Sequence, residues 1–190
     1  MLFIPTFEVG VWNAWIPMLY FPLHPLIMLL IDKLVGTGGM FQKMGGAPYN
    51  KTENLAFISA NVLSFLLLFY AIFLPLKLGT VWFYAGAVIY LFGLVMFIIA
   101  IVNIATTPLG EPFIKGLYRY SRHPMTFFSF FTFIGVGIAT ASGLFLLLSL
   151  MVIIFFVVYV VAEERGCCER YGDSYRQYMN RTPRWLGVPK

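Results

Sequence analysis

Charged side chains are scarce in this sequence: only 11% of its 190 residues are Asp, Glu, Lys or Arg, whereas 60% are hydrophobic. A soluble domain carries roughly 25% charged residues. The apolar residues also come in long blocks rather than in amphipathic stripes, and a helix that is apolar all round needs lipid as its solvent. The shortage of charge therefore excludes an ordinary soluble domain and predicts an integral membrane protein.

Cysteine is also rare, because the only two thiols are the adjacent Cys167 and Cys168. Neighbouring cysteines rarely pair, and two of them without a nearby histidine provide no metal site. We therefore expect two inert thiols and no metal, with palmitoylation left open. The net charge of +5 lies in loops between apolar blocks, without a basic surface interleaved with aromatic residues, so we expect no nucleic-acid partner.

Two glycine clusters, at residues 36–39 and 45–46, superficially resemble a phosphate-binding loop. They follow an apolar block rather than a strand, and they lack the Gly-Lys-Ser/Thr ending that such a loop requires. We expect a flexible loop here.

Five apolar blocks can cross a bilayer: residues 9–31, 55–76, 78–104, 125–141 and 144–162. The first block contains three prolines, so we expect a kinked or broken helix. The 19 residues of the fifth block reach about 28 Å at 1.5 Å per residue, close to the hydrocarbon thickness. The short breaks after the second and fourth blocks predict two tight helical hairpins.

The placement of basic residues favours five spans over four or six. With five alternating helices, residues 32–54, 105–124 and 163–190 share one side and contain 12 of the 13 Lys and Arg residues, all except Lys77. The positive-inside rule then places these segments in the cytoplasm and the amino terminus outside, in a cell inner membrane or an endoplasmic reticulum membrane. The sequence predicts one all-α membrane domain over residues 1–190. Its first three helices lie in residues 1–104, and the last two helices with a cytoplasmic interfacial carboxy-terminal segment lie in residues 105–190.

The few polar residues gather at the two ends of the second predicted hairpin. Arg122, His123 and Pro124 precede its first helix, and Glu163 and Glu164 follow its second. Because a hairpin brings its ends to the same membrane face, we expect these residues to be neighbours. Pro124 suits a first helical turn and keeps His123 out of the helix. A pair of ionisable residues at a membrane boundary is costly without partners, which makes it a candidate functional site.

The polar segments also carry a resemblance to a known family. They read Gly-x-Tyr-(x)3-Arg-His-Pro-Met, then the hairpin, Glu-Glu-Arg, and Tyr-Gly-x-x-Tyr-x-x-Tyr-x-x-Arg-x-Pro, over about residues 100–186. This order is similar to the isoprenylcysteine carboxyl methyltransferase and phospholipid methyltransferase superfamily. The resemblance implies an S-adenosylmethionine-dependent methyltransferase that binds its cofactor from the cytosol and takes a lipophilic acceptor laterally from the bilayer.

Carried over by position, the resemblance also implies that residues 105–190 are the cofactor-binding and catalytic region, and it implies which residues form the site. The implied catalytic residues are Glu163, Glu164, Arg122 and Arg181, of which Arg181 is suited to holding an acceptor carboxylate or phosphate. The implied cofactor-binding residues are Tyr118, Arg122, His123, Pro124, Met125, Glu163, Glu164, Tyr175 and Tyr178. Thr126 and Phe128 stand where the family usually has Tyr and Gly, and we expect Phe128 to narrow the pocket.

Other polar and aromatic residues have simpler expected roles. Tyr171, Tyr175 and Tyr178 share one face of a predicted interfacial helix, either as an aromatic belt or as a cap on the cofactor pocket. We expect Arg119, Arg165 and Trp185 to anchor the membrane interface, and Asn61 and Asn103 to form interhelical hydrogen bonds. His24 is assigned no role.

Two other functions compete with the methyltransferase. Membrane sterol and steroid reductases have a related carboxy-terminal helical arrangement but use NADPH, and a non-enzymatic membrane protein is the other alternative. The acceptor is open between an isoprenylated cysteine, a phospholipid amine and another lipophilic small molecule.

Overall fold

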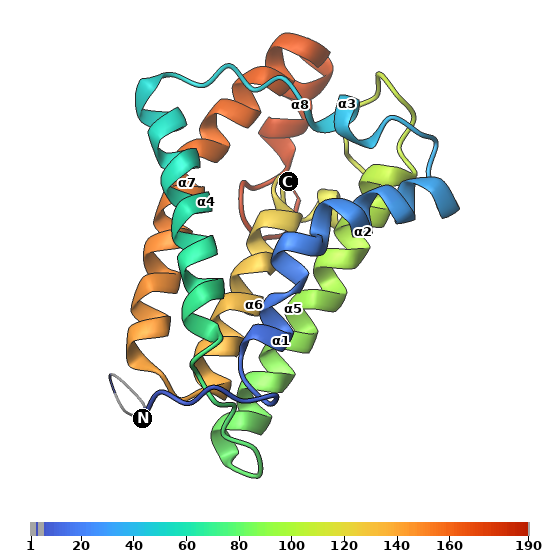
Figure 1. Cartoon of the computed structure of the whole chain (residues 1–190). Coiled ribbons are helices and arrows are strands. Elements are labelled where there is room, and N and C mark those ends of the chain that lie inside the picture. The colour runs from blue at the N-terminus through green and yellow to red at the C-terminus, as the bar shows by residue number, and fades with distance from the viewer. Residues whose placement is uncertain (1–2, 4–5, 190) are drawn as a thin grey trace.

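The computed structural model describes residue 3 and residues 6–189. Within those residues the regular elements are all helices, apart from one isolated β-bridge between Asn13 and Pro75 (Figure 1). The helices in chain order are α1 (Trp15–Met18), α2 (Tyr20–Val35), α3 (Met40–Met44), α4 (Lys51–Ala71), α5 (Val81–Ala105), η1 (Gly116–Arg119, a 3-10 helix), α6 (Pro124–Ala139), α7 (Gly143–Tyr171) and α8 (Asp173–Arg181).

Four helical segments in the described part of the chain are long and apolar enough to cross a membrane: α1 with α2, α4, α5 and α7. The predicted break in the first apolar block is confirmed, because α1 ends at Met18 and α2 begins at Tyr20. The fourth predicted span, residues 125–141, is the shorter helix α6, which has 16 residues and reaches about 24 Å at 1.5 Å per residue.

Of the two predicted hairpins, the second is confirmed and the first is wrong. The helices α6 and α7 are joined by a short turn in which the Ser142 hydroxyl accepts a hydrogen bond from the Phe145 amide (3.2 Å). The helix α4 lies along α7, however, and α5 lies along α6 (Figure 1). Residues 72–80 form a connection rather than a tight turn, and the Lys77 amide donates to the Ala139 carbonyl (3.0 Å) at the end of α6.

Small residues allow α5 and α6 to pack with their backbones in contact. A Cβ atom on Gly135 would lie 2.6 Å from the Tyr90 backbone nitrogen, and one on Gly93 would lie 2.7 Å from the Phe131 Cβ. Both distances are shorter than real carbon contacts, so only glycine fits. Close approach at small residues is the usual way for membrane helices to associate.

The helix α7 is longer than its apolar block and carries the chain into the site. It continues to Tyr171 and ends where Gly172 takes a positive φ of 57°. Tyr171 is therefore on α7, whereas Tyr175 and Tyr178 are on α8, and the expectation of one helix that presents all three tyrosines is wrong.

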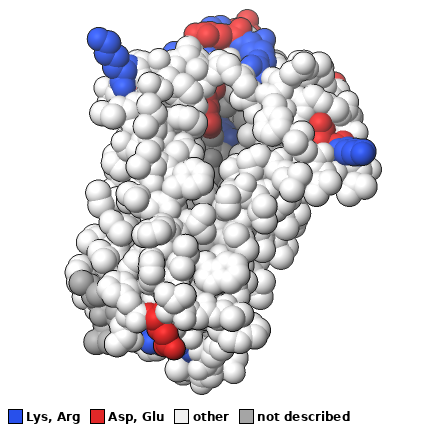
Figure 2. All heavy atoms as spheres, in the orientation of Figure 1, with Lys and Arg blue, Asp and Glu red and all other residues white. Residues whose placement is uncertain are grey.

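Charged side chains lie at the two ends of the molecule, as expected for a protein that crosses a bilayer. On the face drawn in Figure 2, charged side chains gather at the end of the molecule that holds α3 and α8, and a few lie at the opposite end. The broad band between them is uncharged except within one hollow. This band suits contact with lipid acyl chains.

Candidate functional site

The site is built on the first turn of α6. Pro124 occupies the first helical position, and His123 before it is non-helical (φ −128°, ψ 55°), as the sequence predicts. The His123 amide donates to the Ser121 hydroxyl at 3.1 Å, and the imidazole is buried. The proline thus sets the direction in which the histidine leaves the helix.

His123 meets both glutamates of α7, which confirms that the two ends of the hairpin are neighbours. Its Nε2 lies 3.1 Å from Glu164 Oε1, and its Nδ1 lies 3.4 Å from Glu163 Oε2. Arg122 Nε also lies 3.4 Å from Glu164 Oε1. Burial lowers the pKa of His123, but its hydrogen bonds to Glu163 and Glu164 outweigh burial and raise the pKa above the usual 6.5.

The strongest partner of Glu164 is a residue that sequence reasoning missed. Arg184 forms a two-pronged contact with the Glu164 carboxylate, Nη2 to Oε2 at 2.7 Å and Nε to Oε1 at 3.0 Å. The tail that carries Arg184 is fixed because the Arg122 amide donates to the Pro183 carbonyl (3.0 Å). Glu164 is only 3% exposed, so its charge is compensated within the protein.

Arg181 is not brought to this cluster. It is exposed at the end of α8, and together with Arg119 it lines a separate surface cavity of about 460 Å³. The chain turns after Thr182, so the later arginine of the Arg-Thr-Pro-Arg sequence points inward. Arg181 was expected to hold an acceptor carboxylate or phosphate at the site, and the structure instead places Arg184 beside the cluster, where it pairs with Glu164.

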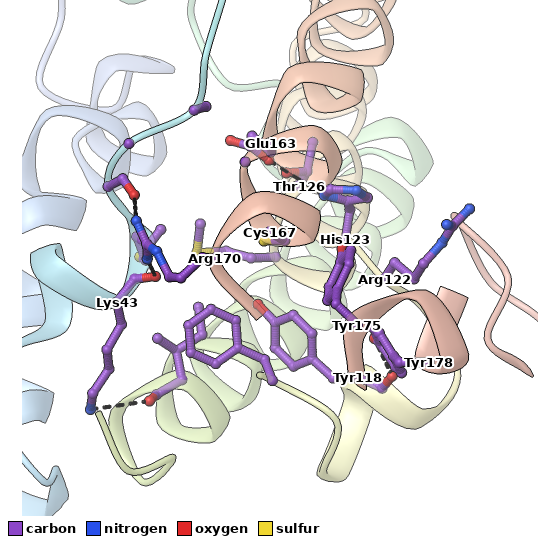
Figure 3. Close-up of a pocket in the computed structure, with 18 residues that line it drawn as sticks. Lys43, Tyr118, Arg122, His123, Thr126, Glu163, Cys167, Arg170, Tyr175 and Tyr178 are labelled. Carbon is purple, nitrogen blue, oxygen red and sulfur yellow. Dashed lines mark hydrogen bonds and ion pairs between the residues drawn. The ribbon is translucent and has the colours of Figure 1, made fainter. Parts of the chain in front are cut away.

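A cavity of about 90 Å³, here called the polar pocket, lies beside the His123 cluster (Figure 3). Two residues of the expected cofactor set, Pro124 and Glu164, do not line it, because they are buried behind its wall. The expected residues that do line it are Tyr118, Arg122, His123, Met125, Glu163, Tyr175 and Tyr178.

One face of α7 forms a wall of the polar pocket. Glu163, Gly166, Cys167 and Arg170 all line it, and Glu163, Cys167 and Arg170 are labelled on this wall in Figure 3. Their spacing of three, four and seven residues is that of a single helical face. Cys167 therefore faces the pocket rather than lipid.

A second wall, which packs against α7, is formed by residues 43–48, here called the strap. Arg170 holds it by donating hydrogen bonds to the backbone carbonyls of Gln42 (3.0 Å), Lys43 (2.7 Å) and Gly45. This segment was expected to be a flexible loop, and the structure instead places it as a pocket wall. Its contacts are to backbone carbonyls, which leave no signal in the sequence.

Two further contacts join the strap to α7. Arg165, expected only as an interface anchor, donates to the Pro48 carbonyl (2.9 Å) and pairs with Glu53 of α4 (2.5 Å). A Cβ atom on Gly166 would lie 3.0 Å from Pro48 Cδ, so a larger residue there would push the strap away.

A second cavity of about 250 Å³, here called the aromatic chamber, lies deeper among α2, α4, α6 and α7. It shares Met44, Met125, Thr126 and Glu163 with the polar pocket, so the two cavities are adjoining. Figure 2 shows the molecule hollowed between α4 and α2, with acidic and basic atoms inside. The other residues that line the chamber are Tyr20, Phe21, His24, Phe57, Asn61, Phe97, Ser129, Phe133, Phe156 and Tyr159.

Thr126 and Phe128, which stand where the family usually has Tyr and Gly, have different surroundings. Thr126 lines both cavities. Phe128 does not narrow the pocket, contrary to expectation, because it is 3% exposed and packs against Phe92 of α5, with ring centroids 5.8 Å apart. Two residues along a helix amount to about 200°, which turns Phe128 away from the cavities.

Of three other expectations, those for Asn61 and Trp185 are revised and that for Asn103 is confirmed. Asn61 donates to the Phe57 carbonyl of its own helix (2.8 Å) rather than to another helix. Asn103 does join two elements, since its Oδ1 accepts from the Leu117 amide of η1 (2.9 Å). Trp185 packs in the site, with its ring 5.8 Å from that of Phe130.

The family model for phospholipid methyltransferases matches residues 81–174, which extend from α5 to the beginning of α8 and include the hairpin with His123, Glu163 and Glu164. No curated protein matches the chain. With the ordered polar motifs and the membrane helices that bring them together, the chain belongs to the phospholipid methyltransferase family of integral membrane methyltransferases.

Proposed function

We propose that this protein transfers a methyl group from S-adenosylmethionine to an amine of a membrane lipid. The observation that carries this proposal is the position of Glu163, which is the only charged residue in the described part of the chain that lines both cavities. A polar pocket for a water-soluble donor and an apolar chamber for a lipid therefore adjoin at one carboxylate.

The residues of the polar pocket fit the methyl donor. Arg122 lines the pocket; its Nε is paired with Glu164 Oε1 at 3.4 Å, and its other N–H groups are the ones that bind the donor's carboxylate. Glu163 and the rings of Tyr118, Tyr175 and Tyr178 suit the donor's positive charges. The cavity of about 90 Å³ is smaller than the roughly 300–1,000 Å³ of typical ligand pockets. The strap must therefore move outward when the donor binds.

The lining of the aromatic chamber favours an amine over a carboxylate acceptor. Among the described residues no Lys or Arg lines the chamber, whereas Glu163 and seven aromatic rings do. An acceptor carboxylate would have no cation to pair with, and burying an unpaired charge is costly. Aromatic faces and a carboxylate instead stabilise an ammonium group, including a methylated one.

Glu163 supplies the proton acceptor that an amine needs. An aliphatic amine is protonated in neutral water, so one proton must leave before its nitrogen can attack, and the Glu163 carboxylate takes that proton. S-adenosylmethionine supplies a methyl carbon whose bond to sulfur breaks as the N–C bond forms, with the electron pair left on sulfur. His123, held by both glutamates, fixes the orientation of Glu163.

In the proposed topology α6 crosses the membrane together with α7, which gives five spans. The amino terminus is then outside, and the polar pocket faces the cytoplasm, where the donor is made. The clustering of basic residues at the α3 and α8 end supports this orientation.

Purified protein provides the test. We expect S-adenosylhomocysteine, but not NADPH, to raise the thermal unfolding temperature. Labelled S-adenosylmethionine should transfer its methyl group to the amine lipids of the native membrane, and Glu163→Gln should lower kcat by at least about 100-fold, as removal of a general base does. The matched control is Glu111→Gln, at an exposed position outside both cavities, which should retain activity. Stabilisation by NADPH alone would favour a reductase instead.

A further inference from the structure

Two polar side chains interrupt the aromatic wall of the chamber below Glu163. His24 comes from α2 and Asn61 comes from α4, and both line the chamber. Both helices precede residue 81, where the match to the family model begins. Polar side chains inside an apolar membrane cavity cost free energy, so they need either a protein partner or a ligand.

Each side chain uses only part of its hydrogen-bonding capacity within the protein. His24 Nδ1 lies 2.5 Å from the Phe21 carbonyl oxygen, which can only accept, so Nδ1 carries the hydrogen and Nε2 is left for another partner. Asn61 Nδ2 donates to the Phe57 carbonyl (2.8 Å), which leaves its second N–H and its Oδ1. Together they offer an acceptor and a donor.

The side chains of His24 and Asn61 lie at the same depth in the aromatic chamber. The rings of Phe21 in α2 and Phe65 in α4 are in contact, with centroids 5.2 Å apart. His24 lies about one turn from Phe21, and Asn61 lies about one turn from Phe65. Because α2 and α4 run in opposite directions (Figure 1), both positions lie on the strap side of this contact.

Their depth below Glu163 follows from a second aromatic contact. The rings of Phe57 and Tyr159 have centroids 5.3 Å apart. Tyr159 lies one turn below Glu163 on α7, and Asn61 lies one turn below Phe57 on α4. Two turns of helix amount to about 11 Å, so the pair lies about 11 Å deeper than Glu163.

We propose that His24 and Asn61 are specificity-determining residues that bind a hydroxyl group of the acceptor, about 11 Å from its reactive amine. This inference rests on the proposed function, which places the amine at Glu163. A hydroxyl can donate to His24 Nε2 and can accept from the Asn61 amide. A phosphate at this depth would have no Lys or Arg to pair with among the residues that line the chamber.

The test compares two long-chain primary amines that differ only in a hydroxyl placed about 11 Å from the nitrogen. Their binding is measured by calorimetry in detergent with S-adenosylhomocysteine present, so turnover is not needed. Wild-type protein should bind the hydroxyl amine about tenfold more tightly, as one good hydrogen bond predicts. Leucine variants of the two residues, His24→Leu and Asn61→Leu, should lose this preference, so that the two amines bind with equal affinity.

The control variant is Ser149→Ala, which removes a buried hydrogen bond within α7 (to the Phe145 carbonyl, 2.8 Å) outside the chamber. It should keep the wild-type preference. Equal binding of both amines by wild-type protein, or an equal loss for both amines in the two leucine variants, would overturn the assignment of His24 and Asn61. A preserved preference without methyl transfer to either amine would overturn the proposed function alone.

Discussion

Glu163 and Glu164 are adjacent in sequence, yet they have different surroundings. Neighbouring positions on a helix differ by about 100°, so Glu163 faces the cavities while Glu164 faces the carboxy-terminal tail. The Glu163 side chain is 38% exposed, whereas that of Glu164 is 4% exposed. The first is available to substrates, and the second holds His123, Arg122 and Arg184 together.

Replacing Arg184 tests this division of roles. Arg184→Ala removes the two-pronged partner of a buried carboxylate, and we expect it to cost about 1–2 kcal/mol of stability, allowing for the partial exposure of Arg184. The Arg184→Ala variant should also bind S-adenosylhomocysteine more weakly than the wild-type protein. Chemical unfolding in detergent micelles and calorimetry measure the two effects. Arg181→Ala, at an exposed position, is the control and should change stability by less than about 0.5 kcal/mol.

The raised pKa of His123 predicts how stability depends on pH. The protonated ring is stabilised in the folded protein, so its contribution is fully present below the ordinary pKa of 6.5 and is lost as pH rises through the raised pKa. The thermal unfolding temperature should therefore fall above pH 6.5. His123→Gln should remove that dependence, and an unchanged slope in this variant would contradict the assignment.

At the scale of single residues, the sequence predicts those whose scarcity makes them visible. Arg122, His123 and the two glutamates stand out because so few polar residues surround them. Arg170 and the strap do not, because their contacts are to backbone carbonyls. The choice of Arg184 over Arg181 depends on the turn after α8, which local sequence patterns do not determine.

At the scale of elements, the closest packing in the protein is between α5 and α6, and it positions the first turn of the site. Replacing Gly135 with leucine should separate these helices, because even a Cβ atom there would lie 2.6 Å from the Tyr90 nitrogen. We expect a loss of about 1–3 kcal/mol or more, as overpacking produces, measured by unfolding in detergent micelles. Ala85→Leu, on the exposed face of α5, is the control and should leave stability unchanged.

The helices themselves are predictable from their apolar blocks, but their neighbours are not. The short breaks after the second and fourth apolar blocks both predict tight hairpins, but only α6 and α7 form one. Apolar helices have no polar face that identifies a partner, so pairing depends on small residues such as Gly93 and Gly135. This is why the pairing of α4 with α7 does not follow from the sequence.

At the scale of the whole molecule, the proposed orientation can be tested by chemical labelling. In a background with Cys167→Ser and Cys168→Ser, Lys77→Cys should react with a membrane-impermeant thiol reagent on intact cells. Lys115→Cys should react only after the membrane is opened, because it lies with the basic segments on the proposed cytoplasmic side. Labelling of both positions from outside would contradict the five-span topology.

The adjoining of the two cavities at Glu163 has a kinetic consequence. Under the proposed function the spent donor would leave toward water past the strap, whereas the lipid would be held from the hydrocarbon side, so that one could be exchanged while the other stays. A lipid amine can therefore receive successive methyl groups during a single residence in the protein. The proposed function therefore predicts a processive enzyme, in which partly methylated products accumulate little.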